Sequence, residues 1–384
     1  MRAAVIGSGI GGLCAAIGLR RAGAEVVVFE RAADLRPGGS GLSLFGNGIR
    51  ALASLGVELM GVTSPEAAMM RGGQRRPDGS WLSTYPGDAL AQLRIVDRAD
   101  LHAVLRAAVP VGVVRGGHEV TAVSPDGEVT RVGPDGAHKT DRFDVVVAAD
   151  GLRSTVRPTF GDDPGVRYAG YSTWRAITDR PVDLHGEAGE TWGVGRRFGI
   201  APLADGRVYW FAVVTAVPGV PVDDDLAALR TLFGAWHDPI PELIESTRPE
   251  AIHYLPIEEL AGTLGSFVHG RIALLGDAAH AMTPNLGQGG GQAMEDAATL
   301  AALLAPLAED ATPDPVAVRA TLGRYDALRR PRSQRIARRS RMIGRLAHVR
   351  GRVLSRARDA AVAATPASVL RRQLDGLQSW EPPA

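Results

Sequence analysis

Short apolar runs, each followed by a helical or polar stretch, recur along the chain. Residues 2–6 and 25–30 form the first two runs, and an apolar helical stretch lies between them. Similar runs return at 145–149 and 272–275. Short apolar runs of this kind are typical of strands that are buried on both faces. The pattern therefore predicts a parallel sheet covered by helices.

Other patterns fill the segments between these strands. We expect helices at 47–55 and 98–108, and a hairpin at 68–96 with its turn at Pro77-Asp78-Gly79. Residues 110–143 alternate short strands with turns, which indicates a β-meander inserted in the parallel fold.

A different composition begins after the third buried run. Residues 166–267 contain aromatic and β-branched runs such as 207–214, which predict a mixed or antiparallel sheet. A helix is expected at 292–304, and the remainder is largely helical, with interruptions at Pro331 and at 364–366. These changes divide the chain into a discontinuous first domain, a sheet domain and a helical tail. The boundaries we expect are 1–165 with 268–310, then 166–267, then 311–384, with the hairpin at 68–96 directed toward the sheet domain.

Composition narrows the classes of protein that fit. The 384 residues are 45% hydrophobic, enough for a large core, and no apolar run is long enough for stable membrane insertion. Cys14 is the single cysteine, so an internal disulfide or a cysteine metal site is excluded, and no metal site is expected. The net charge of +1 gives no general reason to expect nucleic acid as a partner. We expect a cytoplasmic protein, monomeric or homodimeric.

Positive charge is concentrated near the C-terminus. Residues 327–358 carry 12 arginines and no acidic residue, while the rest of the chain has a net charge of −11. Two interpretations are open. The segment is either a helix with solvated arginines that balances an acidic body, or a surface that attracts a phosphorylated cofactor or an acidic partner.

A glycine motif follows the first strand. Gly7 allows a tight turn, Gly9 leaves room for a pyrophosphate, and Gly12 lets the next helix pack closely against the sheet. Glu30 ends the second strand 18 residues after Gly12, near the usual offset for an acid that binds a ribose hydroxyl. The strand, turn and helix context predicts a dinucleotide site.

Two further motifs complete a family pattern. They are Ala149-Asp150-Gly151-Leu152-Arg153-Ser154, and Gly276-Asp277-Ala278-Ala279-His280 with the glycine-rich loop 284–291. In order and spacing, the three motifs resemble those of the single-component (class A) FAD-dependent aromatic monooxygenases of the para-hydroxybenzoate hydroxylase type. The stretch 168–174 is most similar to the salicylate, urate and 3-hydroxybenzoate hydroxylase types.

The resemblance implies an α/β fold with a Rossmann-like FAD-binding domain of the glutathione reductase type, a mixed β-sheet substrate domain and C-terminal helices. It also implies that Glu30 binds the adenosine ribose, that Arg98 reaches the cofactor and that Asp277 accepts hydrogen bonds from the ribityl chain. Arg98 could instead form a helix-start ion pair, and Asp277 could cap a helix. The full cofactor set that it implies is Gly7, Gly9, Ile10, Gly11, Gly12, Glu30, Arg31, Arg98, Asp150, Gly151, Gly276, Asp277, Pro284, Gly287, Gln288, Gly289 and Gly290.

The family chemistry implies that NADH or NADPH reduces FAD and that O2 then gives a flavin hydroperoxide. This intermediate would hydroxylate a small aromatic substrate, phenolic or polycyclic. Arg197 and Tyr209 match substrate-contacting positions of the urate hydroxylase branch and are the catalytic candidates. Asn285 stands where that branch has an aspartate, so urate itself is in doubt.

Several roles remain open around this core. The weaker pocket candidates are Trp174, Arg175, Trp192 and Trp210. Arg157 could assist near Asp150. His280 is expected to be structural. A flavin-dependent epoxidase or reductase on the same fold, or a ligand-binding flavoprotein without activity, would also fit the motifs.

Overall fold

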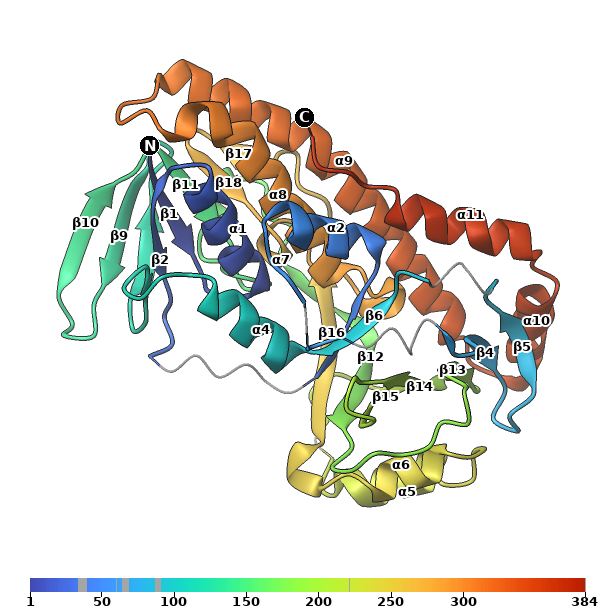
Figure 1. Cartoon of the computed structure of the whole chain (residues 1–384). Helices are drawn as coiled ribbons and strands as arrows, with labels where there is room; N and C mark the ends of the chain where they lie inside the picture. Colours follow the sequence, from blue (N-terminus) through green and yellow to red (C-terminus); the bar gives the residue numbers. More distant parts are fainter. Residues whose placement is uncertain (34–39, 60, 64–68, 87–90, 221, 384) are drawn as a thin grey trace.

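The computed structural model describes residues 1–33, 40–59, 61–63, 69–86, 91–220 and 222–383 of the chain. Within these residues the strands form two large and two small sheets, and helices pack against the two large ones (Figure 1). The predicted α/β fold class is confirmed. The loop at 34–39 and part of the expected segment 68–96 lie outside the described residues.

The first large sheet contains the four predicted buried runs. Its strand order is β17-β18-β11-β1-β2-β7, and all neighbours are parallel except β17 and β18. The bounds are β1 Arg2–Ile6, β2 Glu25–Phe29, β7 Val114–Arg115, β11 Val145–Ala148, β17 Val268–His269 and β18 Ile272–Leu274. Strands β1 and β11 are almost wholly buried, as expected for a sheet covered on both faces.

Helices α1 (Ile10–Arg21) and α8 (Gly289–Ala308) pack against each other beside this sheet. A Cβ atom on Gly18 would lie 2.6 Å from the Cβ of Ala301, so the glycine allows the two helices to approach closely. Helices α2 (Gly46–Ser54) and α4 (Arg98–Ala107) lie close to the predicted ranges. Helix α8 begins three residues earlier than expected, directly at the glycine-rich loop.

Two small sheets flank the parallel sheet. Strands β8 Glu119–Val123, β9 Glu128–Val132 and β10 His138–Arg142 form the predicted antiparallel meander, at the left in Figure 1. Strands β3 Gly41–Leu44 and β6 Arg94–Asp97 pair antiparallel with each other. Strand β6 therefore does not belong to the hairpin in which the sequence pattern placed it.

The second large sheet has the order β16-β12-β15-β14-β13-β4-β5. Its bounds are β4 Gly73–Arg75, β5 Trp81–Thr84, β12 Val166–Ile177, β13 Gly189–Trp192, β14 Arg196–Pro202, β15 Val208–Thr215 and β16 His253–Leu260. The predicted hairpin consists of β4 and β5, and β4 joins this sheet through a parallel pairing with β13. Helices α5 (Asp225–Phe233) and α6 (Ile240–Glu245) cover one face over a core that includes Trp174, Phe198 and Trp210.

The C-terminal helices differ from the expectation at one point. Helix α9 (Pro315–Ala347) continues through Pro331, where the sequence pattern predicted an interruption. Pro331 removes only one backbone donor, and the carbonyl left without that donor belongs to Ala327, an exposed residue at which water can bind. The second interruption is present: α10 (Arg352–Ala363) ends before Pro366, and α11 (Ala367–Gln378) follows.

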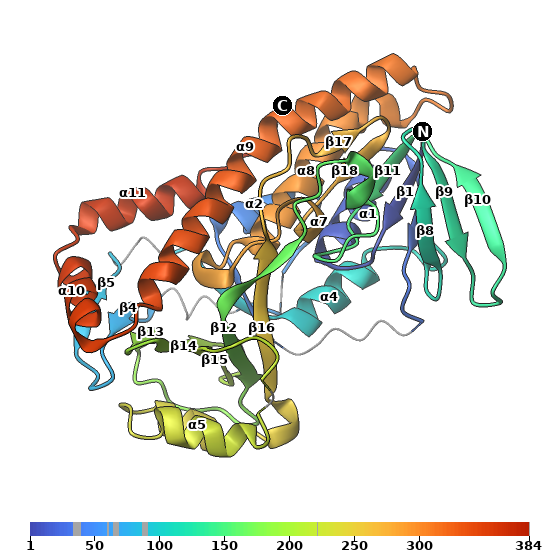
Figure 2. The same cartoon turned by 180° about the vertical axis from the view of Figure 1, so that it is seen from behind.

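Helix α9 connects the two halves of the molecule. Figures 1 and 2 show it running from the parallel sheet to the hairpin side of the second sheet, where α10 and α11 follow. Short helical elements complete the chain: α7 Asp277–His280 and the 3-10 turns Arg157–Phe160, Pro249–Ala251 and Pro284–Leu286. Among the described residues, no helix combines the length and apolar character that crossing a bilayer requires.

Candidate active site

A pocket of about 520 Å³ lies between the two large sheets. On one side it meets the loops that follow the carboxyl ends of β1, β11 and β18, the edge at which open parallel sheets bind ligands. On the other side it meets the face of the second sheet that α5 and α6 do not cover. Eleven of the predicted cofactor residues line it: Gly9, Ile10, Gly11, Arg98, Gly151, Gly276, Asp277, Pro284, Gly287, Gly289 and Gly290.

One wall of the pocket is largely backbone. We call it the glycine wall: Gly9, Ile10, Gly11, Gly151, Gly276, Gly287, Gly289 and Gly290. A Cβ atom built on Gly9 or Gly289 would meet no protein atom within 4 Å. Helices α1 and α8 start at this wall, and no side chain caps either N-terminus. Their first backbone N–H groups have no intrahelical acceptor, so both helices present positive ends to the pocket.

Gly7 and Gly12 support this wall from behind and do not line the pocket. Gly7 has φ +95°, and a Cβ there would lie 2.5 Å from the carbonyl oxygen of Ala149. A Cβ on Gly12 would lie 2.0 Å from the carbonyl oxygen of Gly7. Both glycines are therefore required by packing between the strand, the turn and the helix.

Two charged side chains reach the pocket without a protein partner. No described residue donates a hydrogen bond to the carboxylate of Asp277, which is exposed at the start of α7. It does not cap that helix, since Gly276 is the N-cap residue. The guanidinium of Arg98 likewise has no acceptor among the described residues, and only its backbone N–H is bonded, to Ser40. Within the described ranges, Asp277 therefore does not cap a helix and Arg98 forms no ion pair at the start of α4.

A buried ionic network holds the glycine wall in place. Asp296 accepts hydrogen bonds from the backbone N–H of Gly276 at 3.0 Å, from His280 Nε2 at 2.6 Å and from Arg329 Nε at 2.7 Å. Arg329 also bonds Glu295, which accepts from Asn47 at 2.6 Å. All of these side chains are buried. His280 therefore belongs to this network and does not line the pocket.

The charges of this network favour an ionised Asp296. Burial raises the pKa of its carboxyl group, but the electrostatic interactions with His280 and Arg329 and the hydrogen bonds from His280 and Gly276 outweigh burial. The pKa of Asp296 is lowered to about 2. The group therefore accepts its three hydrogen bonds as a carboxylate at neutral pH.

Four further predicted cofactor residues lie outside the pocket lining. Both Glu30 oxygens accept protein hydrogen bonds, from Ser8 and from the backbone of Ala32, and the neighbouring Arg31 is exposed. Asp150 accepts from the backbone N–H groups of Thr155 and Val156 and so caps the turn after β11.

Gln288 is also placed behind the wall. It is buried, and its Oε1 accepts from Asn47 Nδ2 at 2.9 Å. Arg157, suggested as an assistant of Asp150, is buried and bonds Asp163 at 2.7 Å. Its role in the structure is to fix the segment after Asp150.

The opposite wall is built from side chains of the second sheet. We call it the sheet wall: Thr173, Arg175, Glu190, Arg197, Tyr209, Phe211 and Val213. Because side chains alternate along a strand, these residues share one face, while Trp174 and Trp210 point into the core under α5 and α6. Trp192 does not line the pocket and donates to Glu190 at 2.8 Å.

Arg197 is held firmly within the sheet wall. Its guanidinium bonds the carboxylate of Glu190 at 3.1 Å and the side-chain oxygen of Asn285. The amide nitrogen of Asn285 in turn donates to the Tyr171 hydroxyl at 2.8 Å and contacts Thr283 and Ser340. Glu190 neutralises much of the arginine's charge, and the neutral Asn285 cannot act as an anionic base.

Arg175 differs from Arg197 in having no side-chain partner in the described part of the chain. Its Nε is buried without a hydrogen bond, and no described residue pairs with its guanidinium. Arg175 lies opposite Phe211 on β15, and Tyr209 is two residues away on that strand. This cation was only a weak pocket candidate from the sequence, and the structure makes it the unpaired charge of the sheet wall.

Tyr209 lines the pocket, and no described residue forms a hydrogen bond with its hydroxyl. Burial raises the pKa of this phenol, and Arg175 and Arg197 only partly oppose the shift. Tyr209 therefore stays neutral at ordinary pH and acts as a hydrogen-bond donor or acceptor. Its ring packs against Gly41, where a Cβ would lie 2.2 Å from Tyr209 Cδ1.

Phe211 and Gly199 are cross-strand neighbours that the motifs gave no reason to select. A Cβ on Gly199 would lie 2.0 Å from Cζ of Phe211. The aromatic ring therefore lies flat over the glycine and forms part of the floor of the pocket. Its place follows from strand register, which motif spacing does not specify.

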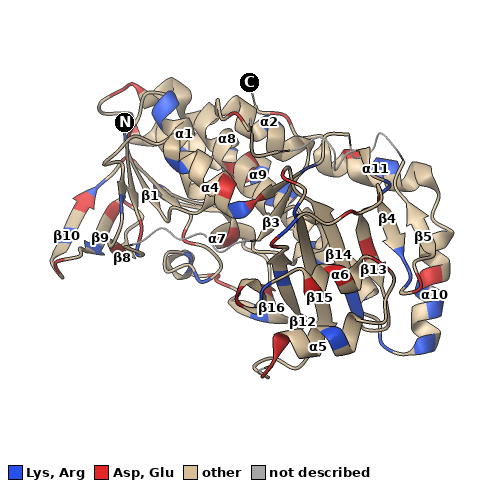
Figure 3. Cartoon of the chain, turned by 60° about the horizontal axis from the view of Figure 1, so that its bottom comes forward, with Lys and Arg blue, Asp and Glu red and all other residues tan. Residues whose placement is uncertain are grey.

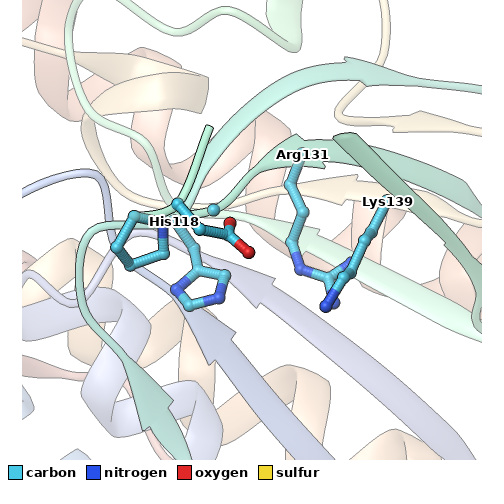
Figure 4. A pocket seen from close by; sticks show the side chains of 6 residues that line it. His118, Arg131 and Lys139 are labelled. Carbon is cyan, nitrogen blue, oxygen red and sulfur yellow. The ribbon is translucent and has the colours of Figure 1, made fainter. Parts of the chain in front are cut away.

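A second, smaller pocket of about 290 Å³ lies on the meander (Figure 4). His118, Arg131 and Lys139 line it together with Asp135, and it shares no residue with the larger pocket. Arg131 forms an ion pair with Asp141. No predicted cofactor or catalytic residue belongs to it.

Comparisons with known proteins agree with this geometry. The family described as "FAD binding domain" matches residues 1–340. The chain is 37% identical over 349 residues to aurachin C monooxygenase/isomerase of Stigmatella aurantiaca, covering 89% of this chain and 88% of that protein. It is 32% identical over 316 residues to FAD-dependent urate hydroxylase of Klebsiella pneumoniae, covering 79% and 81%.

A solved structure shows the same architecture. The crystal structure of Klebsiella pneumoniae HpxO complexed with FAD and uric acid superposes with a TM-score of 0.86 at 28% identity. The match covers 99% of this chain and 97% of that chain.

Proposed function

The chain belongs to the FAD binding domain family, and on this basis we propose that it is a monooxygenase that hydroxylates an aromatic substrate with FAD, O2 and NADH or NADPH. The observation that carries the proposal is a single pocket in which an anion-binding glycine wall faces a polar sheet wall. A cytoplasmic location and a monomeric or homodimeric state are part of the same proposal.

The glycine wall fits an extended dinucleotide. Backbone N–H groups at the starts of α1 and α8 would bind the pyrophosphate and the electron-rich edge of the flavin. The free carboxylate of Asp277 would accept hydrogen bonds from ribityl hydroxyls, and the free guanidinium of Arg98 would contact the cofactor from α4. When bound, FAD supplies the redox chemistry between the nicotinamide and O2.

Three side chains of the sheet wall would bind and orient the substrate. Arg175 would bind an acidic group, because a carboxylate can satisfy a guanidinium through paired charged hydrogen bonds. Arg197 and the neutral Tyr209 would hold a ring hydroxyl. No anionic base stands at Asn285, so the ionised phenol would be favoured by the positive field of Arg175 and, less strongly, by that of Arg197, whose charge Glu190 partly neutralises. We therefore propose an aromatic substrate that carries an acidic group.

Purified protein provides the first test. We expect it to be yellow and to release FAD on denaturation. Changing Asp277 to alanine should weaken FAD binding about tenfold or more, the size of a lost hydrogen bond to a charged group, while D277N should lose less. Protein that gains no flavin on reconstitution would contradict the cofactor assignment.

A substrate panel tests the reaction. The true substrate should increase NAD(P)H consumption and O2 uptake together, and the product should gain one oxygen atom by mass. Product formed without O2 would support a reductase, and an alkene oxide among the products would support an epoxidase. Flavin-loaded protein that oxidises no NAD(P)H with any ligand would support the ligand-binding alternative.

A further inference from the structure

The arginine-rich segment 327–358 divides into two groups in the structure. Five of its arginines form ion pairs within the fold: Arg329, Arg330, Arg332, Arg341 and Arg358. A sixth, Arg339, donates to the carbonyl of Gln373 at 3.4 Å. The other six have no side-chain partner among the described residues: Arg335, Arg338, Arg345, Arg350, Arg352 and Arg356. The segment is therefore not simply a solvated charge run that balances an acidic body, because part of it builds the core and part remains unpaired at the surface.

The unpaired arginines are exposed on α9, on α10 and in the turn between these helices. Positions 335, 338, 342 and 345 recur at intervals of three or four residues, so they follow one face of α9. The chain turns at Gly351, and Arg352 and Arg356 follow four residues apart on one side of the first turns of α10. Figure 3 shows basic segments on α10, at the edge of the molecule.

Exposed apolar side chains are interspersed with these arginines. Met342 and Leu354 are each 61% exposed, Val353 is 80% exposed and Leu346 is 38% exposed. Val194 adds a further exposed apolar group, since the turn that carries it is bonded to this region through Gly195 N–H and the carbonyl of Val349. We call the whole surface the α9–α10 face: Arg335, Arg338, Met342, Arg345, Leu346, Arg350, Arg352, Val353, Leu354 and Arg356.

We propose that the α9–α10 face docks the protein on an anionic lipid surface. Helical surfaces rich in arginine and bearing apolar side chains bind at the boundary between headgroups and acyl chains. The arginines would contact lipid phosphates, and Met342, Val353 and Leu354 would enter the apolar layer. Docking of this kind is peripheral and needs no spanning helix.

Charge argues against other occupants of this face. A second copy docking through the same surface would place arginines opposite arginines, because a two-fold interface is self-complementary. A nucleic acid would bind the arginines but would leave the exposed valine, leucine and methionine side chains in water. An anionic bilayer satisfies both kinds of side chain. The inference rests on the surface alone and does not depend on the proposed function.

Vesicle flotation of the flavin-loaded full chain tests the proposal. We expect the protein to float with vesicles of phosphatidylcholine and phosphatidylglycerol in equal parts, and to remain behind with phosphatidylcholine alone. Binding should fall as salt rises, since salt shortens the range of charge interactions. Equal binding to both vesicle types, or none to the anionic ones at low salt, would overturn the proposal.

Matched variants then locate the surface. The triple variant R338Q/R345Q/R352Q should weaken binding to anionic vesicles on the order of 100-fold, from about fivefold for each arginine near the surface. The control R20Q/R115Q/R319Q removes the same charge from exposed positions elsewhere and should bind almost as the parent does. The double variant V353S/L354S should also weaken binding while keeping every charge.

Two outcomes would reject the α9–α10 face as a lipid-binding surface. If the control loses as much binding as the arginine variant, net charge and not the α9–α10 face is responsible. If the serine variant instead converts a dimer to a monomer in light scattering and keeps vesicle binding, the face is an interface between copies. Flavin content and circular dichroism confirm that each variant is folded.

Discussion

The two walls of the pocket are built in different ways. The glycine wall presents backbone N–H groups and helix ends, and its shape is fixed by buried contacts behind it, such as the ionic network around Asp296. The sheet wall presents side chains, and its chemistry depends on which residues the strand register brings onto one face. A wall made of backbone suits a ligand that stays the same, such as a cofactor. A wall made of side chains can change by substitution to suit a different substrate. If the two walls are independent, substitutions in the glycine wall should change FAD binding and substitutions in the sheet wall should change only substrate binding and turnover.

The largest effect is expected on protein stability, from a substitution in the ionic network behind the glycine wall. Replacing Asp296 with alanine should cost about 3–5 kcal/mol of unfolding free energy, because it removes one partner of a buried ion pair and leaves Arg329 underneutralised. The measurement is urea unfolding monitored by circular dichroism. As a control, Glu242→Ala breaks an exposed pair with Arg180 and should cost no more than about 1 kcal/mol.

The acid dependence of the same residue gives a second readout. The pKa of Asp296 is about 2 in the folded protein, below its value of about 3.9 in the unfolded chain. Its contribution to stability is therefore fully present above about pH 4 and is lost as the pH falls toward 2, a difference of about 2–3 kcal/mol. In D296N this part of the acid dependence should be absent. An unchanged acid profile in D296N would contradict the assignment.

The second largest effect is expected on FAD affinity, from a substitution on the pocket side of the glycine wall. Gly9→Asp should weaken FAD binding on the order of 100-fold, or about 2.7 kcal/mol, because the new carboxylate enters open space where phosphates would bind. The fold should survive, since a Cβ atom at Gly9 meets no protein atom within 4 Å. Fluorescence titration of the apoprotein measures the affinity, with G9A as a milder control. Tight FAD binding by G9D would show that the glycine wall does not bind the phosphates of the cofactor.

A smaller effect is expected on the sheet wall. Arg175→Gln should raise the dissociation constant of an acidic substrate about tenfold, the lower range for a charge-assisted hydrogen bond, and should barely change that of its amide analogue. FAD binding should be unaffected. Arg196→Gln serves as the control, because Arg196 lies on the opposite face and bonds the carbonyl of Leu232. Equal loss for acid and amide would show that Arg175 only shapes the pocket.

The smallest effect is expected at Tyr209. Tyr209→Phe should lower kcat only a few-fold, in the range of a single neutral hydrogen bond of about 1 kcal/mol. Because burial raises the pKa of this phenol, the hydroxyl stays protonated and the alkaline limb of the pH–rate profile should not move. A shifted alkaline limb in Y209F would mean that Tyr209 itself ionises during the reaction.

The glycine wall was largely predictable from the sequence. Its turns follow buried strands directly, so the positions of Gly9, Gly151 and Gly276 depend on local geometry that motif spacing preserves. The resemblance added Arg98 and Asp277, which line the pocket and have no side-chain partner among the described residues. Asp150 and Gln288 were less predictable, because their side chains bond neighbouring groups that the motifs do not specify.

The sheet wall and the ionic network could not be derived from the sequence. Arg175 and Phe211 meet only because β12 and β15 pair in a particular register. Arg329 reaches Asp296 across 33 residues and between two helices, and in the sequence it looked like one member of a solvated run. Pairings between distant elements depend on tertiary packing, which neither composition nor spacing describes.

The ring of Phe211 over Gly199 has a consequence for how such catalysts diversify. A single methyl group added at Gly199, on the far side from the ligand, would have to displace the ring. The cavity would then become narrower although no residue that touches the ligand had changed. Selection for larger or smaller substrates could therefore act on the buried residue at position 199. Protein engineering at the same position could change the size of the pocket while leaving its charged contacts intact.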